Sequence, residues 1–93
     1  MLTDKTYFDI PDHVHSREVD GETIILDMER GVYCGLDGVG AHFFNLIKKK
    51  HSKHDAIDII FSEYDVKRPV LEKDIDQFIE ELLNKSLIKV SVP

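Results

Sequence analysis

The sequence lacks several features that would place it in a familiar class of protein. It has one cysteine in 93 residues, which excludes an intramolecular disulfide and fits a reducing compartment. No apolar run approaches the roughly 18–20 residues that cross a bilayer, and residues 1–5 lack the basic-then-apolar order of a signal peptide. We therefore expect a cytoplasmic protein with no membrane partner that folds by packing alone.

Basic residues are also few. Twelve Lys and Arg stand against eighteen Asp and Glu, which gives a net charge of -6. This charge would repel a phosphate backbone unless the cations were gathered on one face, so we expect no nucleic-acid partner. The one basic cluster, Lys48–Lys50 with Lys53, stands where a helix is predicted to end and where lysines meet the negative end of the helix dipole. A docking patch for an acidic partner is the alternative.

Catalytic and metal-binding patterns are missing as well. Cys34 lies in a predicted strand with no helix N-terminus or basic neighbour to activate its thiol, so we interpret it as a small buried hydrophobe. His13 and His15 lie two residues apart, and His51 and His54 lie three apart. Neither pair has the further ligands that a stable metal site needs. We expect no enzymatic activity, no metal and no cofactor.

The first half of the sequence has the pattern of a small antiparallel sheet. Residues 1–12 are mixed and predict an extended lead-in. Strand Val14–Val19 ends at Asp20-Gly21, a two-residue hairpin signal of type I′. The run Thr23–Met28 is β-branched and apolar on both faces, which predicts the central and most buried strand. After a second turn, Val32–Leu36 forms the third strand.

In the second half, apolar residues recur at helical spacing. Three amphipathic helices and a short extended segment are predicted, at residues 37–50, 53–64, 69–84 and 87–92. Asp37 is the expected N-cap of the first helix, and Ser52 begins a capping box with Asp55. Ninety-three residues support one hydrophobic core, so we expect a single α+β domain, 1–93. Its three-stranded antiparallel sheet and following helices predict a winged helix-turn-helix fold.

Several short motifs in this order resemble the PqqD family over roughly residues 14–90. They are Val19-Asp20-Gly21-Glu22, Ile25-Leu26-Asp27, Gly31-Val32-Tyr33 with Leu36, Gly40-Ala41, Tyr64, Asp74-Ile75, and Leu82 before Leu87-Ile88. Phe43 or Phe44 stands where that family usually has tryptophan. The ordered spacing, rather than any single motif, carries the resemblance.

The resemblance implies a stand-alone recognition element that binds the leader segment of a ribosomally synthesised precursor peptide. It implies that the leader adds antiparallel to the third strand, lies against the third helix, and is delivered to a separate processing enzyme. A cysteine-protease-like leader peptidase of lasso-peptide biosynthesis is the first expectation for that enzyme. A pyrroloquinoline-quinone or other radical-SAM peptide pathway is the alternative.

The exposed edge of the third strand agrees with this expectation, because an unpaired edge is a template for another chain. The predicted peptide-binding residues are Val32, Tyr33, Cys34, Gly35 and Leu36 in the strand and Asp74, Ile75, Phe78, Ile79 and Leu82 in the helix. For the apolar helix residues, ordinary core packing is the alternative. Which strand side chains face the groove stays open, since a slip of one residue reverses the faces. If the Cys34 amide lies on the free edge, Cys34→Pro should abolish binding more than it harms the fold.

A winged-helix DNA-binding regulator is the competing hypothesis from the fold alone. A recognition helix needs basic and amide side chains for the major groove. The third predicted helix instead carries Glu72, Asp74, Asp76, Glu80 and Glu81 against Lys73 and Lys85. We therefore expect DNA to be repelled, and we expect the same acidity to favour a leader with basic residues.

Overall fold

Two tight turns fold the first half of the chain into a three-stranded antiparallel sheet. The computed structural model describes residues 5–36 and 38–91. Strands β2 (Val14–Val19), β3 (Glu22–Asp27) and β4 (Val32–Leu36) pair in the order β2-β3-β4. The predicted strands are therefore confirmed, and β3 is the central one.

The turns have the geometry that their sequences require. Asp20 and Gly21 have φ values of 51° and 83°, and two positive values mark the type I′ hairpin between β2 and β3. Gly31 has a φ of 68° in the turn before β4, where a residue without Cβ carries no steric penalty. Each turn leads directly into the paired register of the next strand.

One face of β3 is buried and the other is not. Thr23, Ile25 and Asp27 are buried, whereas Ile24 and Leu26 between them are only partly covered. Successive residues of a strand point to opposite faces, so the helices cover one side of the sheet only. The prediction that β3 is the central and most buried strand of this sheet is confirmed, and its outer face is apolar but partly exposed.

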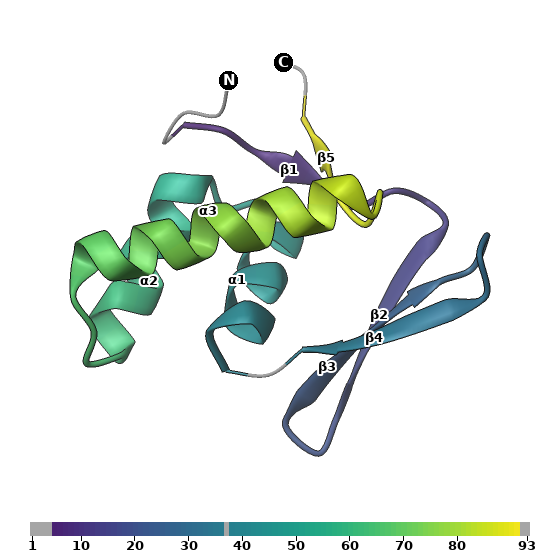
Figure 1. Cartoon of the computed structure of the whole chain (residues 1–93), viewed down its shortest axis with the longest axis horizontal. Helices are drawn as coiled ribbons and strands as arrows, with labels where there is room; N and C mark the ends of the chain where they lie inside the picture. Colours follow the sequence, from purple (N-terminus) through teal and green to yellow (C-terminus); the bar gives the residue numbers. More distant parts are fainter. Residues whose placement is uncertain (1–4, 37, 92–93) are drawn as a thin grey trace.

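Three helices follow the sheet, as predicted. They are α1 (Gly38–Lys48), α2 (Lys53–Glu63) and α3 (Arg68–Asn84) (Figure 1). The hydroxyl of Ser52 accepts a hydrogen bond from the Asp55 amide at 3.2 Å, which confirms this residue as the N-cap of α2. The expected N-cap Asp37 lies outside the described residues. None of the helices in the described part of the chain is long and apolar enough to cross a membrane.

The two ends of the described chain form a second, two-stranded sheet. Strand β1 (Phe8–Asp9) pairs antiparallel with β5 (Lys89–Val90). Phe8 is buried in the core. The Lys50 ammonium lies 2.7 Å from the Asp9 carboxylate and lowers the pKa of that carboxyl. The sequence predicted two extended segments but not their pairing.

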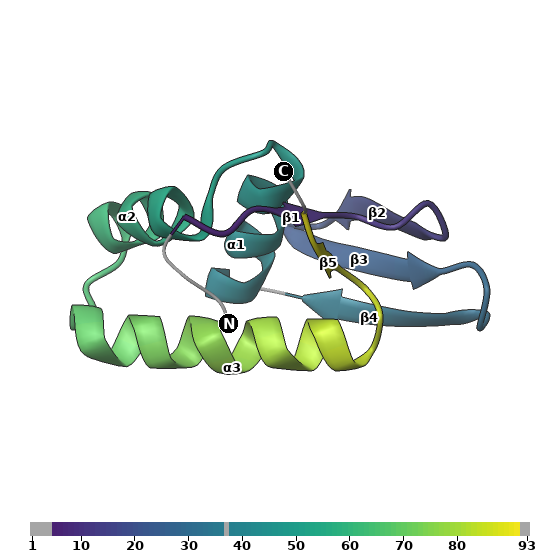
Figure 2. The same ribbon diagram turned by 90° about the horizontal axis from the view of Figure 1, so that it is seen from above.

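The core lies between the inner face of the sheet and the three helices. Its residues are Phe8, Val14, Ile25, Phe43, Phe44, Leu46, Ile47, Ala56, Ile57, Ile60, Leu71, Ile75, Ile79, Leu82, Leu87 and Ile88. The Asn45 side-chain amide donates to the Thr23 hydroxyl at 3.1 Å and so connects α1 to β3. Figure 2 shows that α3 and β4 run in opposite directions and that the C-terminal end of α3 lies near β4.

Ion pairs fix α3 against α2. The Arg68 guanidinium lies 2.7 Å from Asp58, and this contact raises the pKa of Arg68. Near the middle of α3, Asp76 lies 2.7 Å from the nearly buried Lys53 ammonium. Together with the apolar core, these contacts fix the position of α3 relative to α2.

Candidate peptide-binding site

Strand β4 is an edge of its sheet. Within residues 5–36 and 38–91 it pairs with β3 alone, so its second side has no strand partner. Such an edge presents unpaired N–H and C=O groups to another chain. The position that the sequence predicted for an open edge, Val32–Leu36, is the position of β4.

The hydrogen-bond pattern identifies which β4 amides face outward. The Met28 amide donates to the His13 carbonyl at 2.8 Å, so the backbone groups of Met28 and of every second residue before it point to β2. The groups of the intervening residues, including Ile25, must then point to β4. Their partners there include Cys34, whose N–H and C=O are directed inward to β3.

The free edge is therefore formed by the backbones of Tyr33 and Gly35. Both residues alternate with the inward-bonded positions of β4, so their N–H and C=O groups face away from β3. An incoming antiparallel strand finds two donors and two acceptors there. This answers the question that the sequence left open about Cys34, because its amide belongs to the sheet and not to the edge.

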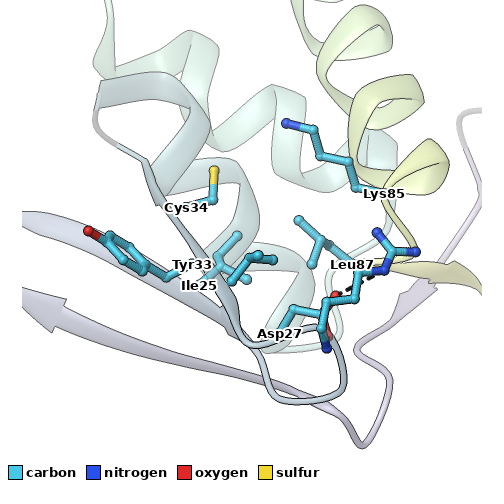
Figure 3. A pocket seen from close by; sticks show the side chains of 8 residues that line it. Ile25, Asp27, Tyr33, Cys34, Lys85 and Leu87 are labelled. Carbon is cyan, nitrogen blue, oxygen red and sulfur yellow. Dashed lines mark hydrogen bonds and ion pairs between the residues drawn. The ribbon is translucent and has the colours of Figure 1, made fainter.

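The same register assigns the β4 side chains to faces. Val32, Cys34 and Leu36 lie opposite Asp27, Ile25 and Thr23, and so share the inner face with these buried residues. Tyr33 and Gly35 belong to the outer face. In Figure 3 the Tyr33 ring points away from Leu87 and Lys85.

A cavity of about 340 Å³ lies between the start of β4 and the end of α3. We call it the β4 pocket, and it is lined by Ile25, Asp27, Arg30, Val32, Tyr33, Cys34, Lys85 and Leu87 (Figure 3). Cys34 is partly exposed here, and Leu87 supplies a buried apolar wall. The pocket combines an apolar floor with charged groups at its rim.

A second cavity, of about 200 Å³, lies between the starts of α1 and α3. We call it the α1 pocket, and it is lined by Val39, Gly40, Val66, Val70, Leu71, Asp74, Ile75 and Phe78. The Phe78 ring packs edge-on against Phe43, with 6.2 Å between centroids. A Cβ at Gly40 would stand 3.4 Å from that ring, so glycine keeps this side of the pocket open.

The structure separates the predicted helix residues into two groups. Asp74, Ile75 and Phe78 line the α1 pocket. Ile79 and Leu82 are buried in the core and line neither pocket, so for these two the alternative of ordinary packing describes their position.

Several lining residues were not predicted as site residues, among them Arg30, Lys85 and Leu87 in the β4 pocket and Val39, Gly40, Val66 and Val70 in the α1 pocket. Lys85 and Leu87 come from the segment after α3, which sequence periodicity assigns to no helix face. Only the tertiary contact between the end of α3 and the start of β4 identifies these residues as part of the pocket, and the sequence pattern does not show that contact.

The remaining charged and metal-binding patterns stay apart from these pockets. No group of three potential metal ligands occurs in the described part of the chain. Of the basic cluster, Lys48 donates to Ser16, Lys50 pairs with Asp9, and Lys53 pairs with Asp76. These partners lie within the protein, so most of the cluster serves internal contacts.

The outer face of the sheet carries its own apolar surface. Ile24 and Leu26 on β3 are partly exposed there, and Tyr33 on β4 is 76% exposed. Val19 and Met28 extend the surface at the ends of the strands and are 51% and 64% exposed. An apolar surface of this kind on a sheet is typical of a protein-protein contact.

Comparison with known proteins gives a family match and two similar solved structures. Residues 22–88 match the protein family described as coenzyme PQQ synthesis protein D (PqqD). The solved structure of TbiB1 in complex with the TbiA(beta) leader peptide is 34% identical, with a TM-score of 0.83 over 90% of this chain and 98% of that chain. A lasso peptide synthetase B1 complexed with the leader peptide has the same fold at 24% identity, with a TM-score of 0.78 over 92% of this chain and 98% of that one. No curated protein matches.

Proposed function

This chain belongs to the PqqD family, and from that premise we propose that it binds the leader segment of a ribosomally synthesised precursor peptide. The observation that carries the proposal is the free edge of β4, with one pocket between β4 and the segment after α3 and a second pocket between the starts of α1 and α3. The 34% identical TbiB1, whose structure holds a leader peptide, supports it. No catalytic step is assigned to the chain.

Leader binding would proceed by β-strand addition. The leader pairs antiparallel with Tyr33 and Gly35, and these main-chain hydrogen bonds give affinity that tolerates many sequences. Directly opposed residues of paired strands share a face, so leader residues opposite Val32, Cys34 and Leu36 point toward α3. Selectivity then comes from every second leader side chain, through the β4 pocket and the α1 pocket.

We further propose that the chain works in trans and delivers the leader to a separate leader peptidase of lasso-peptide biosynthesis. The support is TbiB1, which is 34% identical and whose solved structure holds a leader peptide. The apolar outer face offers a second contact surface that leader binding leaves free. A pyrroloquinoline-quinone or other radical-SAM pathway is the alternative for the enzyme.

The first test is a calorimetric titration with the TbiA(beta) leader peptide. We expect saturable 1:1 binding and no heat with a scrambled peptide of the same composition. Equal binding of both peptides, or of neither, would contradict leader recognition. A salt-sensitive gel shift with duplex DNA would instead support a winged-helix regulator.

The second test concerns the outer face. A Leu26→Glu substitution places a charge in the centre of that apolar surface, away from both pockets. We expect unchanged leader affinity but a leader-cleavage rate by the lasso leader peptidase that falls at least about tenfold, because burying an unpaired carboxylate at an interface costs several kcal/mol.

The matched control for the second test is Phe61→Glu. It makes the same apolar-to-acidic change at a partly exposed position of α2, far from the outer face. Cleavage that is equally fast with Leu26→Glu and Phe61→Glu would exclude the outer face as the docking surface for the peptidase.

A further inference from the structure

The two pockets beside α3 carry single unpaired charges of opposite sign. Asp74 is exposed and lines the α1 pocket, whereas Lys85 is exposed and lines the β4 pocket. Neither side chain forms an ion pair within the part of the chain that the structure describes. The other charged residues of the β4 pocket, Asp27 and Arg30, face each other at 3.6 Å.

The other acidic residues of α3 do not alter this pattern. Asp76 is paired with Lys53, and Glu72 with Arg68. Glu80 and Glu81 are exposed and line neither pocket. The helix is acidic as a whole, but its pockets present an anion at one end and a cation at the other.

The separation of the two charges sets a distance along a bound peptide. Asp74 and Lys85 are eleven residues apart, which corresponds to about 16 Å along a helix at 1.5 Å per residue. An extended strand rises about 3.4 Å per residue, so the same length covers about five residues.

The direction of β4 sets the order of the charges. A strand antiparallel to β4 begins beside Leu36 and ends beside Val32. Since β4 runs opposite to α3, a peptide that continues N-terminally beyond Leu36 runs along α3 toward its N-terminal half, whereas Val32 lines the β4 pocket together with Lys85 (Figure 2). The N-terminal part of such a peptide therefore passes Asp74, and its C-terminal part passes Lys85.

We infer that the groove selects a leader with a basic side chain followed about five residues later by an acidic one. This inference rests on the proposed leader binding. Main-chain pairing alone does not distinguish one register from another, whereas two charges of opposite sign in a fixed order do. A leader in the reverse order would place like charges together at both pockets.

The test is a charge scan of the TbiA(beta) leader peptide by fluorescence polarisation. Each position is replaced in turn by Lys and by Glu, and the ratio of the two dissociation constants is recorded. With the wild-type protein we expect one position that prefers Lys and, about five residues toward the C-terminus, one that prefers Glu. Both preferences should be about two- to fivefold, the range of exposed ion pairs, and should shrink in 0.5 M salt.

Substitutions in the protein then assign each preference to its side chain. Asp74→Lys should reverse the preference at the N-terminal position only. Lys85→Glu should reverse the other one only, and Lys85→Gln should remove it without reversal. Lys73→Glu is the control: it changes the net charge as Lys85→Glu does, at an exposed position that lines neither pocket, and should change neither preference.

The outcomes separate this inference from the proposed function. If the wild-type protein binds none of the peptides, leader binding fails and the inference fails with it. If it binds, but the preferences occur in the opposite order or respond equally to Lys73→Glu, leader binding stands and the charge inference is overturned.

Discussion

Replacing Gly35 by proline is expected to weaken leader binding at least tenfold while the protein remains folded. Gly35 contributes an outward N–H to the free edge of β4, and proline replaces that hydrogen by a ring carbon that meets the incoming strand. Loss of the hydrogen bond costs about 0.5–1.5 kcal/mol, and the ring adds a steric block, so a rise in Kd of at least about tenfold follows.

The fold should tolerate this change. A Cβ at Gly35 would meet Glu22 and Ile24 side-chain atoms at 3.5 and 3.7 Å, which are ordinary contact distances. Proline is accepted on edge strands where its missing N–H faces solvent. Gly35→Ala is the matched control, because it adds the Cβ but keeps the N–H, and we expect it to bind the leader as the wild-type protein does.

Cys34→Pro, one residue away, should have the opposite effect. Its amide points to β3, opposite the buried Ile25, so proline removes a hydrogen bond of the sheet and leaves a buried carbonyl unpaired. That costs about 1–3 kcal/mol, and each kcal/mol lowers Tm by about 4–8 °C in a protein of this size. The condition under which this variant would spare the fold, a Cys34 amide on the free edge, is not met, since the free amides are those of Tyr33 and Gly35.

Calorimetry and a leader titration of the three variants decide the matter. A folded Gly35→Pro that binds as tightly as Gly35→Ala would contradict strand addition at this edge. A folded Cys34→Pro with normal Tm would show that the register differs from the one described.

The sequence was sufficient for features that depend on local patterns. Asp20-Gly21 fixes a type I′ hairpin, and a two-residue hairpin fixes the register of β2 against β3. Helical spacing located α1, α2 and α3 to within a few residues. These features follow from the conformational preferences of neighbouring residues, and no tertiary contact is needed to read them.

The sequence was insufficient where distant segments meet. Nothing local to Phe8 or Lys89 indicates that β1 pairs with β5. The inclusion of Lys85 in the pocket beside Cys34 depends on where α3 ends relative to β4. Periodicity showed that Ile79 belongs to the apolar face of α3 but not whether that part of the face meets the core or a groove. The residues that line the pockets could therefore be identified only from the structure, whereas strand β4 could be predicted from the sequence.

Asp27→Ala is expected to produce a large loss of stability for a substitution of a polar residue near the site. The Asp27 carboxylate is buried, and its Oδ1 accepts hydrogen bonds from the Glu29 and Arg30 amides at 3.0 and 3.1 Å. These bonds hold the turn that leads into β4, and the Asp27 carbonyl accepts a further bond from Gly31 at 2.9 Å. Hydrogen bonds to a charged group contribute about 1.5–3 kcal/mol. Water can partly replace the acceptor in an exposed turn, so we expect a total loss of about 2–3 kcal/mol.

Two further variants separate the hydrogen bonds from the ion pair. Asp27→Asn retains an oxygen acceptor and should lose less than half as much stability. Arg30→Ala removes the contact to Asp27 at 3.6 Å, but the guanidinium is more than half exposed, so we expect a loss of no more than about 0.5 kcal/mol.

Urea and thermal unfolding of the three variants, followed by leader titration under conditions where each is folded, test the role of this turn. At about 4–8 °C per kcal/mol, Tm of Asp27→Ala should fall by roughly 8–24 °C. Leader affinity should fall with it, because the turn that orients Tyr33 and Gly35 is no longer held. If Asp27→Asn were as unstable as Asp27→Ala, the charge rather than the acceptor would support the turn. If Asp27→Ala bound the leader normally when folded, β4 would be held in place by its pairing with β3 alone.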